Sequence, residues 1–328
     1  MKILVYDTAA EYGGALAVLK SYYDKALKDK DNEWVFVVSK KSYLPNNENI
    51  KVIEQSFPKK SWLHRLYYDK FIVSKVIDAE EPDLIYNLQN IYVKNKRRAK
   101  QIIFLHQSIP FTKVKISVFD FKIWVYKNII GKMIFKSIKK CDGVIVQTNW
   151  IKEAILEKKL CQADKITISK DFANVKVTHQ YRGQSNGFFY PADAFSYKDH
   201  FSVLKASKVL KNKGIDIKLF FTLLGNENKL AKKLYKFASK NKLDVEWLGK
   251  LKPEEVMSKY AETTLVFPSY LETYGLPMLE ARLTNAPIIA SDTPFAKEVL
   301  EGYQKVSYYP PKDYLALAKL MEDNLSAS

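Results

Sequence analysis

Residues 267–280 read Phe-Pro-Ser-Tyr-Leu-Glu-Thr-Tyr-Gly-Leu-Pro-Met-Leu-Glu. They begin at the last residue of a short apolar run that predicts a buried strand. Gly275 and Pro277 predict a tight turn into a helix, because glycine permits the turn and proline suits the first helical position. Backbone amides at such a helix start point outward at the positive end of the helix dipole, which favours phosphate. The carboxylates of Glu272 and Glu280 flank this site and can accept hydrogen bonds from sugar and ribose hydroxyls. The plain alternative is a strand-to-helix loop with two solvated acids.

Similar apolar runs occur along the whole chain, separated by polar stretches with helical spacing. The runs are short and rich in Val, Ile and Phe, which favours parallel sheets covered on both faces. They lie at 3–6, 34–38, 51–53, 84–86, 101–105 and 143–147, and again at 187–190, 218–224, 245–248, 264–267 and 287–290. Two such series predict an α/β protein with two doubly wound, Rossmann-like domains.

A polar stretch separates the two series. Between residues 165 and 186 the periodicity is lost, and Asn, His, Gly, Gln and Ser accumulate. We therefore place a first domain at 1–170 and a second at 171–328, each of ordinary domain length. Doubly wound domains bind ligands at the carboxyl ends of their strands, so the cleft between the domains is the expected site.

The composition is that of a globular protein with an unusual charge. The chain has 328 residues, of which 47% are hydrophobic and 27% charged, and its formal net charge is +17. It contains no uncharged apolar run of about 18 residues and no signal peptide, so we expect a cytoplasmic protein. Cys141 and Cys161 lack metal or redox spacing and are expected to be reduced. The positive charge predicts an anionic partner.

Much of this charge lies in residues 94–140, which hold thirteen Lys and Arg residues and one acidic residue, Asp120. From residue 111 to 140 lysines alternate with aromatic and aliphatic residues, so a helix here would have a basic side and a broad apolar side. Such a helix can lie on anionic lipid, which predicts peripheral attachment at the inner membrane face. The alternative is a packed helix pair with solvated lysines. Nucleic acid is not expected, because no recognition module is visible.

The segment 267–280 resembles the Glu-x7-Glu signature of retaining glycosyltransferases of the GT-B fold, particularly the large family four. The family pattern runs Pro-Ser-x-x-Glu-x-x-Gly-x-x-x-x-Glu-Ala, and it is filled here by Pro268, Ser269, Glu272, Gly275, Glu280 and Ala281. The resemblance covers the second half of the chain and, more loosely, the first. It implies two Rossmann-like domains facing a central cleft, the first binding the acceptor and the second the nucleotide sugar.

On the donor side the resemblance implies a role for each matching residue. Glu280 would bind the donor ribose, and Glu272 the transferred sugar. Lys198 fits the lysine that binds the diphosphate, but the arginine that the family carries nearby is absent from 190–198. The diphosphate would be held by the backbone of Thr273, Tyr274, Gly275 and Leu276. The nucleotide base would be lined by the backbone of Leu248, Gly249 and Lys250.

The first half carries weaker candidates. Gly13 and Gly14 follow the first predicted strand, where the family has a glycine loop that faces the donor. His106 ends another strand, where the family places a histidine that reaches the transferred sugar. A simple turn and a hydrogen-bonded structural histidine are the alternatives. We take Glu272, His106 and Lys198 as the catalytic candidates, and we expect no metal site.

The resemblance thus implies retaining, metal-independent transfer of a sugar from a nucleoside-diphosphate sugar to an acceptor hydroxyl. A glycan or lipid-linked precursor of a cell-surface polysaccharide is the expected acceptor, and no cofactor is expected besides the donor substrate. Two alternatives stay open: a nucleotide-sugar epimerase of the same fold, and a non-catalytic protein that binds nucleic acid or membrane. The resemblance also implies a return helix after residues 314–324, and since only 325–328 follow, we expect that helix to be absent or the chain shortened.

Overall fold

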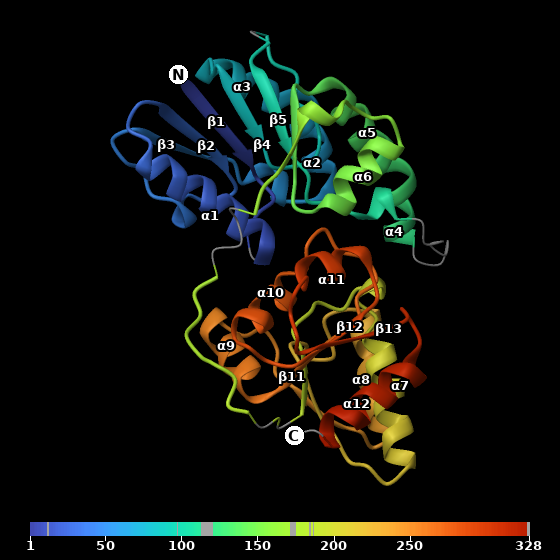
Figure 1. The fold of residues 1–328 in the computed structure, drawn as a ribbon. Helices are drawn as coiled ribbons and strands as arrows, with labels where there is room; N and C mark the ends of the chain where they lie inside the picture. The colour runs from blue at the N-terminus through green and yellow to red at the C-terminus, as the bar shows by residue number, and fades with distance from the viewer. Residues whose placement is uncertain are drawn as a thin grey trace. The chain divides into compact units, whose positions relative to one another are not determined.

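The computed structural model describes residues 1–11, 13–96, 98–112, 121–170, 175–183, 185 and 187–326. The chain forms two compact units, Met1–Asn174 and Val175–Ser328, and each is built on its own parallel sheet (Figure 1). The division lies four residues after the boundary expected at residue 170. The predicted α/β class, with two doubly wound, Rossmann-like domains, is confirmed by the two parallel sheets and their helices.

The first unit contains a seven-stranded sheet in the order β3-β2-β1-β4-β5-β6-β7, and every pair of neighbouring strands is parallel. The strand order reverses between β1 and β4, and open α/β sheets bind ligands outside the carboxyl ends of their strands at such a point. The strands are β1 (Lys2–Asp7), β2 (Glu33–Val38), β3 (Ile50–Glu54), β4 (Leu84–Asn87), β5 (Lys100–Phe104), β6 (Gly143–Val146) and β7 (Ile166–Ile168).

Two apolar clusters attach helices to this sheet. Leu4, Val35 and Ile85 pack with residues of the helices that follow β3, and Ile103 and Val144 pack with residues of the helices on either side of β6. The helices of the unit are α1 (Gly13–Lys28), α2 (Trp62–Tyr67), the π-helix η3 (Tyr68–Ile72), α3 (Val73–Glu80), α4 (Phe121–Val125), the π-helix η5 (Tyr126–Ile130), α5 (Gly131–Lys140) and α6 (Asn149–Glu157). Single 3-10 turns lie at η1 (Lys41–Tyr43), η2 (Phe57–Lys59), η4 (Ile109–Phe111) and η6 (Ala163–Lys165).

The second unit contains a six-stranded parallel sheet in the order β10-β9-β8-β11-β12-β13, so its strand order reverses between β8 and β11. In Figure 1, α7, α8 and α12 lie together and α9, α10 and α11 form a second group, in agreement with their packing contacts. The strands are β8 (Phe188–Tyr190), β9 (Lys218–Phe221), β10 (Asp244–Trp247), β11 (Thr264–Phe267), β12 (Ile288–Ser291) and β13 (Val306–Tyr309). The helices are η7 (Ser196–Lys198), α7 (His200–Asn212), α8 (Lys229–Lys240), α9 (Pro253–Glu262), α10 (Leu276–Leu283), α11 (Pro294–Val299) and α12 (Tyr314–Ser326).

The basic stretch is helical from residue 121 to 140, but it is not one regular α-helix. The π-helix η5 interrupts it, so positions before and after that turn do not keep the spacing of 100° per residue that the sequence argument assumed. Arg97 and residues 113–120, which belong to the same basic segment, lie outside the described residues. In the described part of the chain, no helix is long and apolar enough to cross a membrane.

Candidate functional site

The second unit places two predicted residues in direct contact at the point where its strand order reverses. Lys198 ends the turn η7 after β8, and Glu272 lies in the loop after β11. The Lys198 ammonium donates a hydrogen bond to Glu272 Oε1 and forms an ion pair with it. Their side chains are only 17% and 15% exposed, so water screens the pair weakly. The pair gives this edge of the sheet a fixed cation beside a fixed carboxylate.

Hydrogen bonds between the two loops hold this pair in position. Ser269 is fully buried, and its hydroxyl donates to Glu272 Oε1 at 2.8 Å. The Tyr270 amide donates to the Tyr197 carbonyl at 3.1 Å, and the Tyr190 hydroxyl donates to the Lys198 carbonyl at 2.9 Å. The loop that carries the cation is therefore attached both to its own strand and to the loop that carries the carboxylate.

The turn predicted at Gly275 is present, and the structure shows why glycine is needed there. Gly275 has φ 92°, and a Cβ atom added to it would lie 2.5 Å from the Met278 side chain. It is the N-cap of α10, which begins at Leu276, so Pro277 is the second helical residue and not the first. The first-turn amides of an α-helix have no helical acceptors. The backbone of Thr273 to Leu276 thus forms the expected loop and helix start beside Glu272.

Glu280 lies on α10 and has its own partner. The buried Tyr260 of α9 donates its hydroxyl hydrogen to Glu280 Oε2 at 2.9 Å. Burial raises the pKa of Glu280 above its ordinary value, and the Tyr260 hydrogen bond opposes this rise. Tyr260 was not among the predicted site residues, because an isolated tyrosine in a helix gives no functional signal in a sequence.

The backbone of residues 248–250 follows β10, but two of its amides are already used. Leu248 donates to the Phe221 carbonyl at 2.9 Å, and Gly249 donates to the Leu223 carbonyl at 3.1 Å. Any backbone contact to a base from Leu248 and Gly249 would therefore use their carbonyl groups. Lys250, the third predicted residue, is exposed.

The remaining predicted residues belong to the first unit. Gly13 and Gly14 are not in a loop but are the first two residues of α1, while Tyr12 lies outside the described residues. His106 follows β5, and its amide donates to Asn90 Oδ1 at 2.7 Å. Its Nε2 atom is buried without a partner among the described residues. Burial lowers the pKa of His106 to about 4, so the ring is neutral at pH 7.

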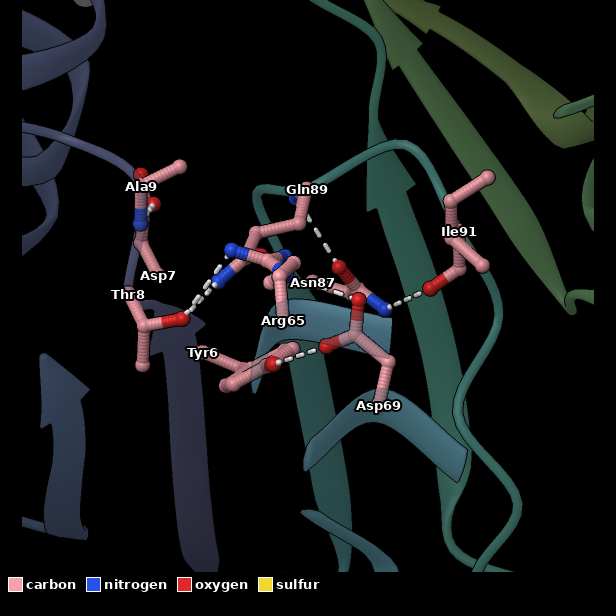
Figure 2. A network of polar contacts seen from close by, with 9 residues as sticks. All are labelled: Tyr6, Asp7, Thr8, Ala9, Arg65, Asp69, Asn87, Gln89 and Ile91. Atoms are coloured by element: carbon pink, nitrogen blue, oxygen red, sulfur yellow. Dashed lines mark hydrogen bonds and ion pairs between the residues drawn. The ribbon is translucent and has the colours of Figure 1, made fainter. Parts of the chain in front are cut away.

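A polar network that the sequence did not predict lies at the carboxyl edge of the first sheet, where the neighbouring strands β1 and β4 end (Figure 2). Arg65 of α2 donates to Asp69 at 2.7 Å and to the Thr8 hydroxyl at 3.3 Å. The Gln89 amide group donates to the same hydroxyl at 3.1 Å. These residues come from three separate parts of the sequence, and no motif in the sequence links them.

Comparison with known proteins gives a family for the second unit. Residues 172–328 match the family model described as glycosyl transferases group 1. The O-antigen chain mannosyltransferase RfbU of Salmonella typhimurium is 25% identical over 209 residues, which are 61% of this chain and 58% of that protein. The serotype-specific mannosyltransferase WbdA of Escherichia coli is 31% identical over 134 residues, 39% of this chain and 16% of that protein. The chain thus spans less than two thirds of each relative.

Solved structures share the fold over nearly the whole chain. WaaG, a glycosyltransferase involved in lipopolysaccharide biosynthesis, superposes with a TM-score of 0.70 at 10% identity and covers 100% of this chain and 93% of its own. HepE from Anabaena, in a complex with UDP and glucose, gives a TM-score of 0.66 at 16% identity and covers 98% of this chain and 89% of its own. Residues 172–328 are therefore similar to the glycosyl transferases group 1, and the chain shares the GT-B fold of these solved structures over nearly its whole length.

Proposed function

We propose that this protein transfers a sugar, with retention of anomeric configuration, from a nucleoside-diphosphate sugar to a hydroxyl group of a glycan or lipid-linked acceptor. The observation that carries the proposal is the Lys198–Glu272 pair beside the start of α10, at the switch point of the second sheet. A cation and a helix start suit a diphosphate, and Glu272 and Glu280 suit hydroxyl groups. Both relatives described above are named as mannosyltransferases, so a mannose donor is the first candidate.

In the proposed reaction the acceptor oxygen forms a bond to the anomeric carbon while the bond from that carbon to the diphosphate breaks. The acceptor proton passes to the departing phosphate oxygen. Lys198 and the first-turn amides of α10 stabilise the negative charge that develops on the diphosphate, and they are already in position before the reaction. His106 is neutral at pH 7, so its part is to hydrogen-bond the sugar and not to neutralise charge. The first unit would bind the acceptor.

The proposal is tested by incubating the purified chain with guanosine- and uridine-diphosphate sugars, with and without a glycan acceptor. We expect acceptor-dependent release of nucleoside diphosphate, a product with the anomeric configuration of the donor, and unchanged turnover in EDTA because Lys198 meets the phosphate charge. Thermal shift with each nucleoside diphosphate should show stabilisation of the protein. Conversion of the donor without acceptor would indicate the epimerase instead. A protein that no nucleoside diphosphate stabilises would contradict both enzymatic functions.

We further propose that the first unit lies on anionic membrane lipid. Large apolar side chains, which a soluble protein normally buries, are exposed among lysines on two helical stretches of this unit. On α4, η5 and α5 they are Phe121, Tyr126, Ile129 and Met133, and on α2 and η3 they are Leu63, Leu66, Tyr67 and Phe71. Lys132, Lys136 and Lys139 of α5 are exposed as well. Lysines near lipid headgroups with aromatic and aliphatic side chains at the interface are typical of peripheral membrane helices.

Vesicle flotation checks this surface. We expect the wild-type chain to bind vesicles that contain phosphatidylglycerol, to bind phosphatidylcholine vesicles poorly, and to dissociate in high salt. Replacing Phe121 and Ile129 together by serine should weaken binding by about tenfold or more, because the buried apolar area is lost. Leu315→Ser is the matched control, since Leu315 is 59% exposed in the other unit. Vesicle binding that does not depend on the salt concentration, or an equal loss of binding in Leu315→Ser, would contradict the proposal.

A further inference from the structure

The polar network of the first unit contains hydrogen-bonding atoms that the protein itself leaves unused. Asp7 is 1% exposed, and its Oδ1 accepts hydrogen bonds from the amides of Ala9 and Ala10 at 2.8 and 3.0 Å. Its other oxygen, Oδ2, is buried without a partner among the described residues, and so is Oε1 of Gln89, which is 7% exposed. Buried polar atoms are normally paired, so two unpaired acceptors in one network point to a partner from outside the chain.

The location is one where this kind of fold binds ligands. Asp7 ends β1 and Gln89 follows β4, the two strands between which the order of the sheet reverses. Ligands of open α/β sheets bind outside the carboxyl ends of the strands at this point. Figure 2 shows Asp7, Thr8, Arg65 and Gln89 converging there from two strand ends and one helix.

The charges and hydrogen-bonding groups indicate which chemistry fits. Asp7 Oδ2 and Gln89 Oε1 need donors, which phosphate dianions lack and sugar hydroxyls supply. Arg65 offers donors that a hydroxyl oxygen can accept, and its pairing with Asp69 fixes it in place. Two carboxylates, Asp7 and Asp69, lie near this guanidinium, and the neighbouring Lys59 is already paired with Glu11, so an additional anion is disfavoured. Burial also raises the pKa of Asp7 to about 6, because nothing inside the network fully replaces water around that carboxylate.

We propose that Asp7, Gln89 and Arg65 form a binding site for two neighbouring hydroxyl groups of the acceptor sugar. Both unpaired oxygens are covered in the free protein, while Arg65 is 27% exposed. A sugar therefore enters by displacing Arg65 from the Thr8 hydroxyl, its longest contact in the network at 3.3 Å. One hydroxyl then donates to Asp7 and the other to Gln89, and Arg65 donates to a sugar oxygen. This site rests on the proposed function, because it defines the acceptor of that reaction.

Two variants test the site with little change in shape: Asp7→Asn and Gln89→Met. With the proposed transfer assay, each should raise the KM for a mannose-terminated acceptor by about 10- to 100-fold, as for the loss of a hydrogen bond to a charged or buried group. The KM for the donor should stay within about twofold, because the donor site belongs to the second unit. Asp142→Asn is the matched control, since Asp142 accepts the Gln101 amide at the start of β5, at the opposite edge of the same sheet.

A binding measurement separates this inference from the transferase activity itself. In ligand-observed NMR with mannobiose, wild type, Asp142→Asn and Glu280→Gln should show saturation transfer, and Asp7→Asn and Gln89→Met should lose it. Equal sugar signals in wild type and Asp7→Asn, or no signal in the wild type, would overturn the site. A wild type that binds mannobiose through Asp7 but no nucleoside diphosphate would instead contradict the proposed function and leave the sugar site standing.

Discussion

Lys198→Met is expected to lower turnover by roughly 100- to 1000-fold, the loss that follows removal of one preorganised group from developing charge. Lys198 is the only cation in residues 190–198, where the family carries an arginine as well. Its ammonium is held in place by Glu272 before any ligand arrives, so its contribution requires no reorganisation. Steady-state kinetics with saturating donor and acceptor measures the effect, and a loss smaller than tenfold would contradict the role of Lys198.

The same substitution should also weaken folding, and a second variant separates the two effects. Without Lys198, the largely buried Glu272 carboxylate keeps the Ser269 hydroxyl as a donor but loses its ion pair. This loss should lower the free energy of unfolding by about 3 kcal/mol, the lower end for a broken buried ion pair. Adding Glu272→Gln removes the unpaired charge and should restore most of this stability, while turnover stays low. Urea unfolding measures both.

A matched control for this experiment lies in the same unit. Lys218→Met breaks the Lys218–Glu246 pair, whose atoms lie 2.9 Å apart and whose side chains are both 43% exposed. It should change the free energy of unfolding little and leave turnover unchanged, because exposed ion pairs contribute little. Recovery of turnover in the double variant Lys198→Met and Glu272→Gln would show that Lys198 serves folding alone.

Glu280→Gln is expected to weaken donor binding by about 10- to 100-fold, because the amide accepts hydroxyl hydrogen bonds less strongly than a carboxylate does. Turnover at saturating donor should change less than the donor Kd. Calorimetry with the nucleoside diphosphate measures this effect. An unchanged Kd would remove Glu280 from the donor site and with it the second half of the Glu-x7-Glu assignment.

The pH dependence of donor binding gives an independent check on Glu280. Its pKa is raised by burial, so the carboxylate takes up a proton, and donor affinity falls, at a higher pH than for an exposed glutamate. Tyr260→Phe removes the hydrogen bond that lowers this pKa and should move the loss of affinity to still higher pH. Glu280→Gln should lack this loss altogether. The stability contribution has the opposite sign: a carboxyl whose pKa is raised on folding opposes folding above that pKa, and this penalty disappears as the pH falls.

Most of the architecture followed from the sequence because long, buried parallel strands appear as continuous apolar runs. Two strands were missed, β7 and β13, and both lie at a sheet edge. The strand β7 has only three residues, and β13 is interrupted by the exposed, polar Ser307. Such strands contain too few apolar residues to be recognised as a run in the sequence. Their strand structure depends on hydrogen bonds to the neighbouring strand of the sheet.

The site was predictable where its residues are close in sequence. Glu272, Gly275 and Glu280 share one turn and helix, so their spacing carried the information. Contact between Lys198 and Glu272 joins residues 74 positions apart and follows from the adjacency of β8 and β11. The network around Arg65 and Gln89 had no signal of this kind, because each residue alone resembles an ordinary polar residue on a helix or a loop.

The π-helix η3 and its neighbours α2 and α3 form one unbroken helical stretch, 62–80, whose two sides differ. Arg65 and Asp69 join the polar network on one side, and Leu66 and Phe71 are exposed. A helix with its side chains is about 10–12 Å across, so a bilayer docked on the exposed side would lie about that far from Asp7. The helix would then act as a spacer that fixes the height of the reacting sugar above the lipid. Acceptors with the target sugar close to their lipid anchor would be favoured over long, fully extended chains.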